Sequence, residues 1–227
     1  IDAPALSNLS GNNEITTSIG QTTGGSRANI ESQADLLTLS GGFAPTTATG
    51  TRTVQFMGAG NILVSGAVDN GSATGGLSVI KSGTGTLTYT AANTYTGTTT
   101  VSGGTLEVNN TTGSGTGTGA VTLQTSTILG GSGIITGPVT VESGGMISPG
   151  EGAALGTSNK TLTYTAASAT AVTIDDGGQI QLGITTEVFN SSAFAAAIQG
   201  GGAADALDYL TGAGAGELGS WNAVPGA

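Results

Sequence analysis

The side chains that could carry acid–base or metal chemistry in this sequence are almost all carboxylates. The 227 residues include no His and no Cys, which excludes Ser-His-Asp catalysis, Cys-His catalysis and ordinary zinc sites. Two carboxylates can cleave a glycosidic bond when they flank it, so a polysaccharide-cleaving site is the chemistry to test. The candidate carboxylates are Glu107, Glu142, Glu151, Asp175, Asp176, Asp205 and Asp208.

The residues around these carboxylates do not favour such a site. Asp175 and Asp176 are adjacent, so on a strand they would point to opposite faces, and the stretch IDDGGQI is typical of a turn. Lys81 and Arg52 are isolated cations that define no substrate groove. Trp221 is the only Trp, and it is either a packing residue or a platform for a sugar ring.

A second possible pair, Glu107 and Glu142, fails on register. Aligning Val101 with Val141 in a repeat places Glu142 opposite Ser102 and not opposite Glu107. We therefore predict no catalytic residue, no metal ligand and no cofactor, and we expect that the protein is not an enzyme.

Charge and composition narrow the classes of partner. The net charge is −10, from 14 acidic and 4 basic residues, so nucleic acid is not an expected partner because its phosphates require clustered cations. No stretch approaches the ~18 consecutive apolar residues of a membrane helix, so we expect no membrane insertion. The sequence starts at Ile1 without a basic and apolar leader, and we expect a secreted protein whose signal peptide has been removed.

The elements that would position any site form a repeat. The phrase TLTYTAA occurs at 86–92 and again at 161–167, and Val101, Val121 and Val141 follow each other at steps of 20 residues. A repeat of this length is typical of one coil of a parallel β-solenoid. Within TLTYT, Leu87 and Tyr89 would point to one face and the threonines to the other.

Alternating residues bounded by Gly, Asn and Ser predict strands throughout the chain. The segment NSSAFAAAIQGGG predicts a short helix near 191–199, which would cover a coil edge or serve in docking. We expect N-terminal coils, a cap or an assembly strand over 1–50, a β-helix core over 51–185, and C-terminal coils with the helix, as a cap or an assembly region, over 186–227. The expected strands are 36–40, 51–56, 61–65, 77–81, 86–90, 162–165, 171–174, 179–184 and 206–210.

The stretch SGTGTLTYTAANTYTGTTTVSGGTLEV, Ser82 to Val108, resembles the autotransporter-associated β-strand repeat, also called the passenger-associated transport repeat. The glycine-rich coils that follow end in a Ser148-Pro149-Gly150 turn, which is similar to the usual continuation of that repeat. The resemblance implies a right-handed parallel β-helix in a secreted or surface-exposed bacterial protein, often fibrous or adhesive. It names no ligand.

These observations favour an extracellular structural solenoid that assembles with itself into a fibre, filament or surface layer. The alternative is an adhesin or a carbohydrate-binding passenger segment of a secreted bacterial surface protein, with surface glycans as the partner, and a polysaccharide-cleaving enzyme is the third hypothesis. The two ends of a solenoid are open strand edges, which a homopolymer can use by stacking or by exchanging a terminal strand.

The segment NNEITTSIG is the candidate for a strand lent to a neighbouring copy, with an ordinary first coil as the alternative. Strand lending predicts that deletion of residues 1–20 leaves a folded protein that no longer assembles. The candidate assembly residues are Asn13, Glu14, Ile15, Thr16, Thr17, Ile19 and Trp221.

Overall fold

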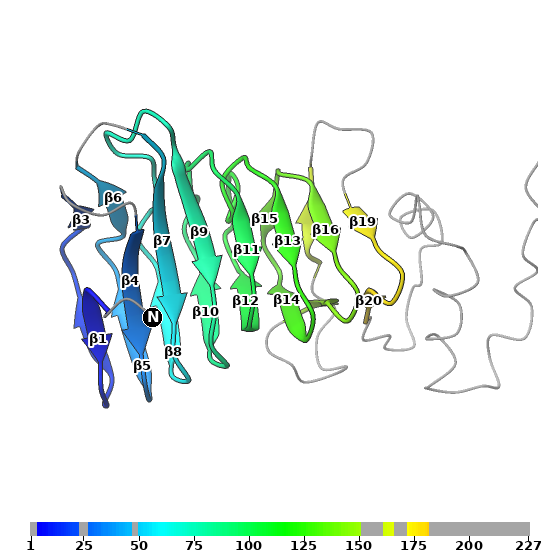
Figure 1. Ribbon diagram of the computed structural model, residues 1–227, viewed down its shortest axis with the longest axis horizontal. Coiled ribbons are helices and arrows are strands. Elements are labelled where there is room, and N and C mark those ends of the chain that lie inside the picture. Colours follow the sequence, from blue (N-terminus) through cyan, green and yellow to red (C-terminus); the bar gives the residue numbers. More distant parts are fainter. Residues whose placement is uncertain (1–3, 23–26, 47–49, 151–160, 166–171, 182–227) are drawn as a thin grey trace, which may run out of the picture.

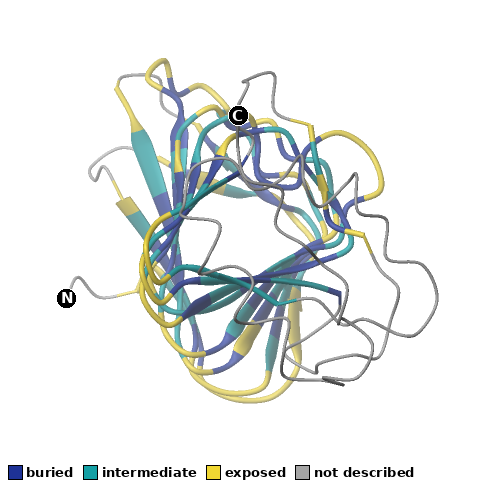
Figure 2. Cartoon of the chain, turned by 90° about the vertical axis from the view of Figure 1, so that its right-hand side faces the viewer, coloured by how far each residue is buried: buried dark blue, intermediate teal, exposed yellow. Residues whose placement is uncertain are grey.

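The structure is a stack of β-coils. The computed structural model describes residues 4–22, 27–46, 50–150, 161–165 and 172–181, and every regular element in them is a β-strand. The strands wind around one axis (Figure 1), and the view along that axis shows them arranged in a closed outline (Figure 2). The predicted parallel β-helix is confirmed. The helix predicted near 191–199 lies outside the described residues.

One side of the stack is an eight-stranded parallel sheet, which we call sheet A. Each strand pairs with the next one along the axis, so these strands number the coils from 1 to 8. In spatial order they are β1 (Leu6–Asn8), β4 (Arg27–Ser32), β7 (Arg52–Met57), β9 (Leu77–Lys81), β11 (Thr99–Val101), β13 (Val121–Leu123), β16 (Val139–Val141) and β19 (Val172–Ile174).

A second eight-stranded parallel sheet, sheet B, forms the next side. It takes one strand from each coil, and its order follows the chain as that of sheet A does. Its strands are β2 (Asn13–Ile15), β5 (Leu36–Leu39), β8 (Asn61–Val64), β10 (Thr86–Tyr89), β12 (Gly104–Val108), β14 (Thr127–Gly131), β17 (Met146–Pro149) and β20 (Gln179–Ile180).

The third side has fewer strands. β3 (Ile19–Gln21) pairs with β6 (Phe43–Pro45) in the first two coils, and β15 (Ile134–Ile135) pairs with β18 (Thr163–Tyr164) in the sixth and seventh. Coil 1, residues 4–22, thus contains β1, β2 and β3, and coil 2, residues 27–46, contains β4, β5 and β6. In coils 3 to 5 the third side has no strand among the described residues, and side chains take over part of the pairing there.

The core is made of columns of inward side chains, because strand residues alternate between the two faces of a sheet. In the first copy of TLTYT, Leu87 and Tyr89 are fully buried while Thr86 and Thr88 are half-buried on the outer face, as predicted. The best example is an inward column of sheet B, in which one polar residue is followed by seven apolar ones: Asn13, Leu37, Ile62, Leu87, Leu106, Leu129, Ile147 and Ile180.

The regular step of 20 residues is wrong in detail. Val101 pairs with Leu123, which pairs with Val141, whereas Val121 lies opposite Thr99 in the neighbouring inward column. Coils therefore differ in length, from 18 residues between positions 123 and 141 to 33 between 141 and 174. The loops at the corners absorb the difference without disturbing the columns, because only the strands are held in register.

The two copies of TLTYTAA do not occupy equivalent positions. The first forms β10 in sheet B, but the second contributes Thr163 and Tyr164 to β18 on the third side, opposite Ile134 and Ile135. Local alternation decides which side chains point inward. The number of residues in the preceding corner decides on which side of the coil the strand falls.

Candidate functional site

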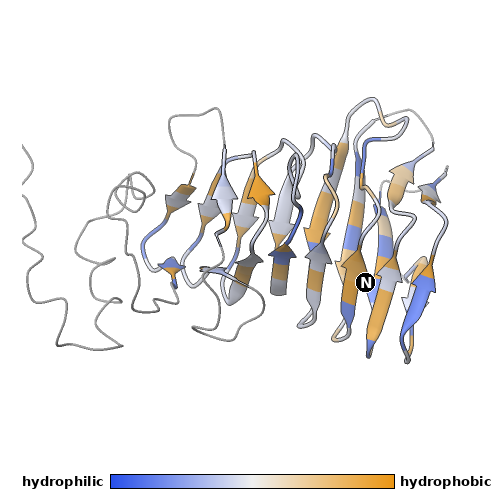
Figure 3. Cartoon of the chain, turned by 180° about the vertical axis from the view of Figure 1, so that it is seen from behind, coloured by the Kyte–Doolittle hydropathy of each residue, from blue (hydrophilic) through white to orange (hydrophobic). Residues whose placement is uncertain are grey.

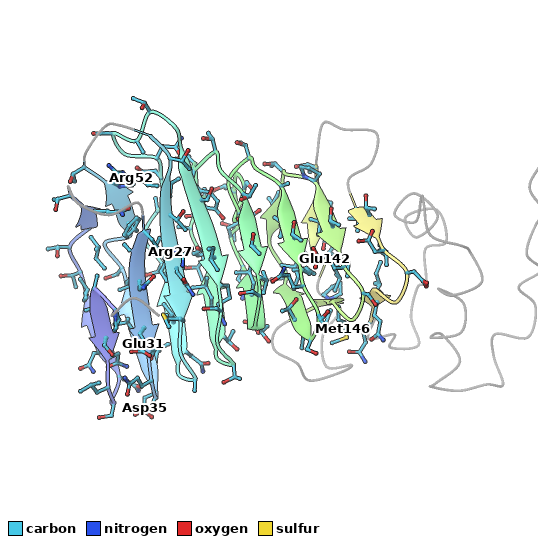
Figure 4. All side chains as sticks on the ribbon, viewed as in Figure 1. Arg27, Glu31, Asp35, Arg52, Glu142 and Met146 are labelled. Carbon is cyan, nitrogen blue, oxygen red and sulfur yellow. The ribbon has the colours of Figure 1, made fainter. Side chains whose placement is uncertain are left out.

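The singled-out carboxylates that the structure describes lie at outward positions of the stack. Glu107 lies on the outer face of β12, where its register neighbours are Thr88 and Gly130. Glu142 follows β16, far along the stack from Glu31 and Asp35 (Figure 4). The prediction that Glu107 and Glu142 do not form a pair is confirmed by this register.

One carboxylate pair does arise, and the sequence argument missed it. Val141 pairs with Ile174, so the residues that follow them, Glu142 and Asp175, are neighbours in adjacent coils. Asp175 also begins a turn, because its carbonyl oxygen accepts a hydrogen bond from the Gly178 amide (2.8 Å), as the IDDGG pattern predicts. Both side chains are at least partly exposed on an outer face. Their register gives two like charges side by side.

The structure does not describe four of the other candidates. Glu151, Asp205, Asp208 and Trp221 lie outside the described residues. Among the residues that the structure describes, no three His, Cys, Asp or Glu side chains converge on a point that could hold a metal ion. The same part of the chain contains no helix long and apolar enough to cross a bilayer.

Lys81 is the most unusual charged residue of the described structure. It occupies an inward position of sheet A between Phe56 and Val101, and only 2% of its surface is exposed. Its Nζ donates hydrogen bonds to the carbonyl oxygens of Ser82, Gly83 and Gly103, each at 3.0 Å. Burial lowers the pKa of the ammonium group from 10.5 to about 8. This lysine joins two corners of adjacent coils.

Asn93 replaces missing strand pairing on the third side of the stack. Its side chain is buried, its Oδ1 accepts a hydrogen bond from the Val68 amide (2.8 Å), and its Nδ2 donates to the Gly115 carbonyl (2.5 Å). One amide group therefore connects coil 4 to the coils on both sides. The sequence signal was an Asn at a predicted corner, where a side-chain amide can substitute for a backbone group.

Two tyrosines fill the interior next to this corner. Tyr95 is fully buried and its hydroxyl shares a hydrogen bond with the Thr99 hydroxyl (2.7 Å). Tyr89 packs edge-to-face against Phe56, with ring centroids 6.2 Å apart. Burial raises the pKa of both tyrosine hydroxyls above the usual value of 10.0. The largest side chains of coil 4 thus serve packing, and their polar ends are neutral.

Apart from Trp221, which lies outside the described residues, the candidate assembly residues lie in coil 1, whose strands pair within the same chain. Asn13, Glu14 and Ile15 form β2 and pair with β5, and Ile19 belongs to β3 and pairs with β6. Thr16 and Thr17 are exposed in the corner between these strands. Coil 1 therefore pairs with coil 2 through three parallel strand pairs.

Comparison with known protein families identifies one segment of the chain. The sequence model of the passenger-associated-transport-repeat family matches residues 79–108. The chain contains a passenger-associated transport repeat. No curated protein and no solved structure matches the chain. The repeat suggests a passenger domain of an autotransporter and implies a secreted or surface protein.

The matched segment corresponds to a structural unit. It runs from within β9 to the end of β12, which is nearly all of coil 4 and the start of coil 5. It contains the three residues that hold these layers together from within, Lys81, Asn93 and Tyr95. All three are buried, so within the passenger-associated transport repeat they serve the interior of the solenoid.

Proposed function

We propose that the protein is an extracellular structural rod that associates with further copies of itself into a fibre or surface layer. The observation that carries the proposal is the unbroken stacking of eight coils, with both main sheets running through all of them. At ~4.8 Å per layer, the described coils span about 34 Å along the axis. A stack of this kind is stiff along its axis because every layer is hydrogen-bonded to the next.

The chemistry of the surface supports a structural role. The outer face of sheet A carries a row of threonines at register-paired positions in coils 5 to 8: Thr100, Thr122, Thr140 and Thr173. Such uncharged rows leave few groups that could polarise a bond in a substrate. The passenger-associated transport repeat supports an extracellular location of the protein. Copies would join through the ends of the solenoid or by exchanging a terminal strand.

Electron microscopy of the native material tests the proposal. We expect filaments or sheets whose axial repeat corresponds to the length of one rod, and purified protein that forms the same objects as its concentration rises. Isolated rods of one length at all concentrations would contradict self-association. The repeat-based assignment to a secreted or surface protein would be unaffected by that result.

The enzymatic alternative has its own experiment. The full chain is incubated with a panel of polysaccharides, and newly formed reducing ends are measured, with Glu142→Gln and Asp175→Asn as matched variants. We expect no release by any of the three proteins. Release by the unmodified chain that both variants lack would revive the enzyme hypothesis at the carboxylate pair.

A further inference from the structure

We propose that Asn70 is a site of spontaneous deamidation that reacts while the chain is unfolded, and that the folding of coils 3 and 4 stops the reaction. The inference goes beyond the proposed function and does not depend on self-association. Asn70 lies in the corner between β8 and β9, and with Gly71 it forms the only Asn-Gly pair of the sequence. The corners of the stack are mostly pale or blue, while the orange, apolar residues lie mainly on the strands (Figure 3).

The reaction takes place within the chain and consumes only water. The backbone nitrogen of Gly71 gives up its proton and attacks Cγ of Asn70. A bond forms between that nitrogen and Cγ, the bond from Cγ to Nδ2 breaks, and the amide group leaves as ammonia with the proton that Gly71 lost. Water then opens the resulting succinimide ring at either carbonyl group and leaves aspartate or isoaspartate at position 70. Glycine leaves its nitrogen open to this attack because it has no side chain.

The first argument is that the fold occupies the attacking nitrogen. The Gly71 amide donates a hydrogen bond to Oδ1 of Asp69 (2.6 Å). Hydrogen bonds to a carboxylate are stronger than those between neutral groups. Loss of the amide proton would place an anionic nitrogen against this carboxylate, and the two would repel each other. The folded corner therefore disfavours the deprotonated nitrogen that the reaction requires.

The second argument is that the side-chain amide under attack is held by coil 4. Oδ1 of Asn70 accepts hydrogen bonds from the backbone amides of Leu77 (2.9 Å) and Thr96 (3.1 Å), and Nδ2 donates to the Thr96 hydroxyl (3.1 Å). Succinimide formation brings Cγ onto the Gly71 nitrogen, and these three bonds resist that movement. In the folded protein the reaction therefore waits for a local opening between coils 3 and 4.

The third argument is that the corner has no room for one of the products. Gly71 has a φ of 48°, and a Cβ added to it would overlap the carbonyl oxygen of Pro45 in coil 2. The Ser72 amide donates a hydrogen bond to the same oxygen (2.8 Å). Isoaspartate adds one carbon atom to the backbone, and closely packed groups do not accept an extra atom without displacement. A chain that has formed isoaspartate at position 70 should therefore fail to rebuild coil 3.

The first experiment measures the reaction in the folded and the unfolded full chain. Both samples are kept at the same mildly alkaline pH and temperature, one in buffer and one in guanidinium chloride above the unfolding transition, and peptide mass spectrometry follows Asn70. We expect a half-time at least about tenfold longer in the folded protein, because the corner must open before it reacts. Asn61, which precedes the bulky Ile62, is the internal reference and should stay unreacted in both samples. Equal half-times at Asn70, or no reaction there in the unfolded chain, would overturn the proposal.

The second experiment removes single partners of the site. Asp69→Ala frees the Gly71 amide, Thr96→Val removes the hydroxyl that accepts from Asn70 Nδ2, and Ser72→Ala is the control in an exposed side chain of the same corner. We expect the first two variants to deamidate about two- to tenfold faster than the unmodified chain when folded, which corresponds to the loss of one hydrogen bond, and equally fast when unfolded. The control should match the unmodified chain in both states.

Circular dichroism establishes that each variant is folded in buffer. Folded Asp69→Ala and Thr96→Val proteins that deamidate no faster than the control would overturn the protective role of these hydrogen bonds. If either variant does not fold, the comparison of the folded and unfolded unmodified chain decides.

The third experiment tests the fate of the product. The unmodified chain is aged in guanidinium chloride, the denaturant is removed, and gel filtration separates refolded from unfolded chains. We expect isoaspartate at position 70, identified by fragmentation in the mass spectrometer, to be depleted from the refolded fraction. Asn70→Asp is the matched variant and should fold, since its carboxylate can still accept from the amides of Leu77 and Thr96. An equal share of isoaspartate in both fractions would overturn the conclusion that coil 3 has no room for it.

Discussion

The ammonium group of Lys81 donates a hydrogen bond to the carbonyl oxygen of Gly103, one coil further along the stack and 22 residues later in the chain. The Lys81 side chain occupies a column whose neighbours on both sides are apolar, Phe56 and Val101. Its charge is balanced by carbonyl dipoles alone among the contacts that Nζ makes. Because of this corner, we expect the free energy of unfolding to increase as the pH rises through the range in which Lys81 titrates.

We expect the free energy of unfolding to rise with pH from about 8 towards about 10. The pKa of Lys81 is lowered from 10.5 to about 8 in the folded protein, so in this window the unfolded state binds more protons than the folded state. Urea unfolding at several pH values, compared with Lys81→Met, isolates the effect. Parallel pH profiles for the two proteins would contradict it. Measurements above about pH 10 are avoided, because the buried tyrosines favour the opposite trend there.

Asn93→Ala is expected to lower the free energy of unfolding by about 2–4 kcal/mol, because it leaves the Val68 amide and the Gly115 carbonyl without their partner. Asn93→Asp should be no milder, since it places an acceptor against that carbonyl. The matched control is Asn109→Ala, which removes an acceptor from the Ser132 amide at a less buried corner. Equal urea midpoints for the Asn93 and Asn109 variants would argue against the view that Asn93 holds coil 4 to the coils on both sides.

Gly119→Ala should destabilise the fold by ~1–3 kcal/mol or more, because an added Cβ would overlap the carbonyl oxygen of Gly97 in the preceding coil. The backbones of successive coils approach each other closely at this corner. Gly130→Ala is the milder control, since its Cβ would lie 3.2 Å from the nearest atom, the Ser148 carbonyl oxygen. Thermal unfolding followed by circular dichroism compares them. A Gly119 variant as stable as the Gly130 variant would show that the corner can widen.

Glu142→Gln is expected to raise the free energy of unfolding slightly, by less than about 1 kcal/mol, because it removes a charge beside Asp175 in the next coil. The gain should shrink as salt is added, since added ions screen exposed charges. Glu107→Gln serves as the comparison, because its register neighbours, Thr88 and Gly130, are uncharged. A gain for Glu142→Gln that is independent of salt would point to a cause other than repulsion.

Much of the layer structure could be predicted from local pattern. The expected strand 77–81 coincides with β9, and the inward positions of Leu87 and Tyr89 follow from alternation alone. The strand Arg27–Ser32 was not predicted, although Ala28 and Ile30 alternate with polar residues there. Its signal is weak because charged and amide side chains surround the two apolar ones.

Position within a coil could not be predicted in the same way. Val121 lies two residues out of the register expected for it, opposite Thr99, and the second TLTYTAA falls on a different side of the coil from the first. Both depend on the number of residues in each corner loop. Loop length is not fixed by any periodic pattern, so it becomes visible only when the strands are paired.

The sequence by itself determined that this protein is a β-solenoid with a passenger-associated transport repeat, because alternation and turn residues act locally and recur in every layer. Only the tertiary structure decided what the exceptional residues do. Lys81 and Asn93 are polar residues at ordinary positions in the sequence, and their roles come from the carbonyl and amide groups that neighbouring coils place around them. Asn13 belongs to a short strand whose place in the coil the sequence pattern does not reveal, and strand pairing sets it in the inward column of Leu37.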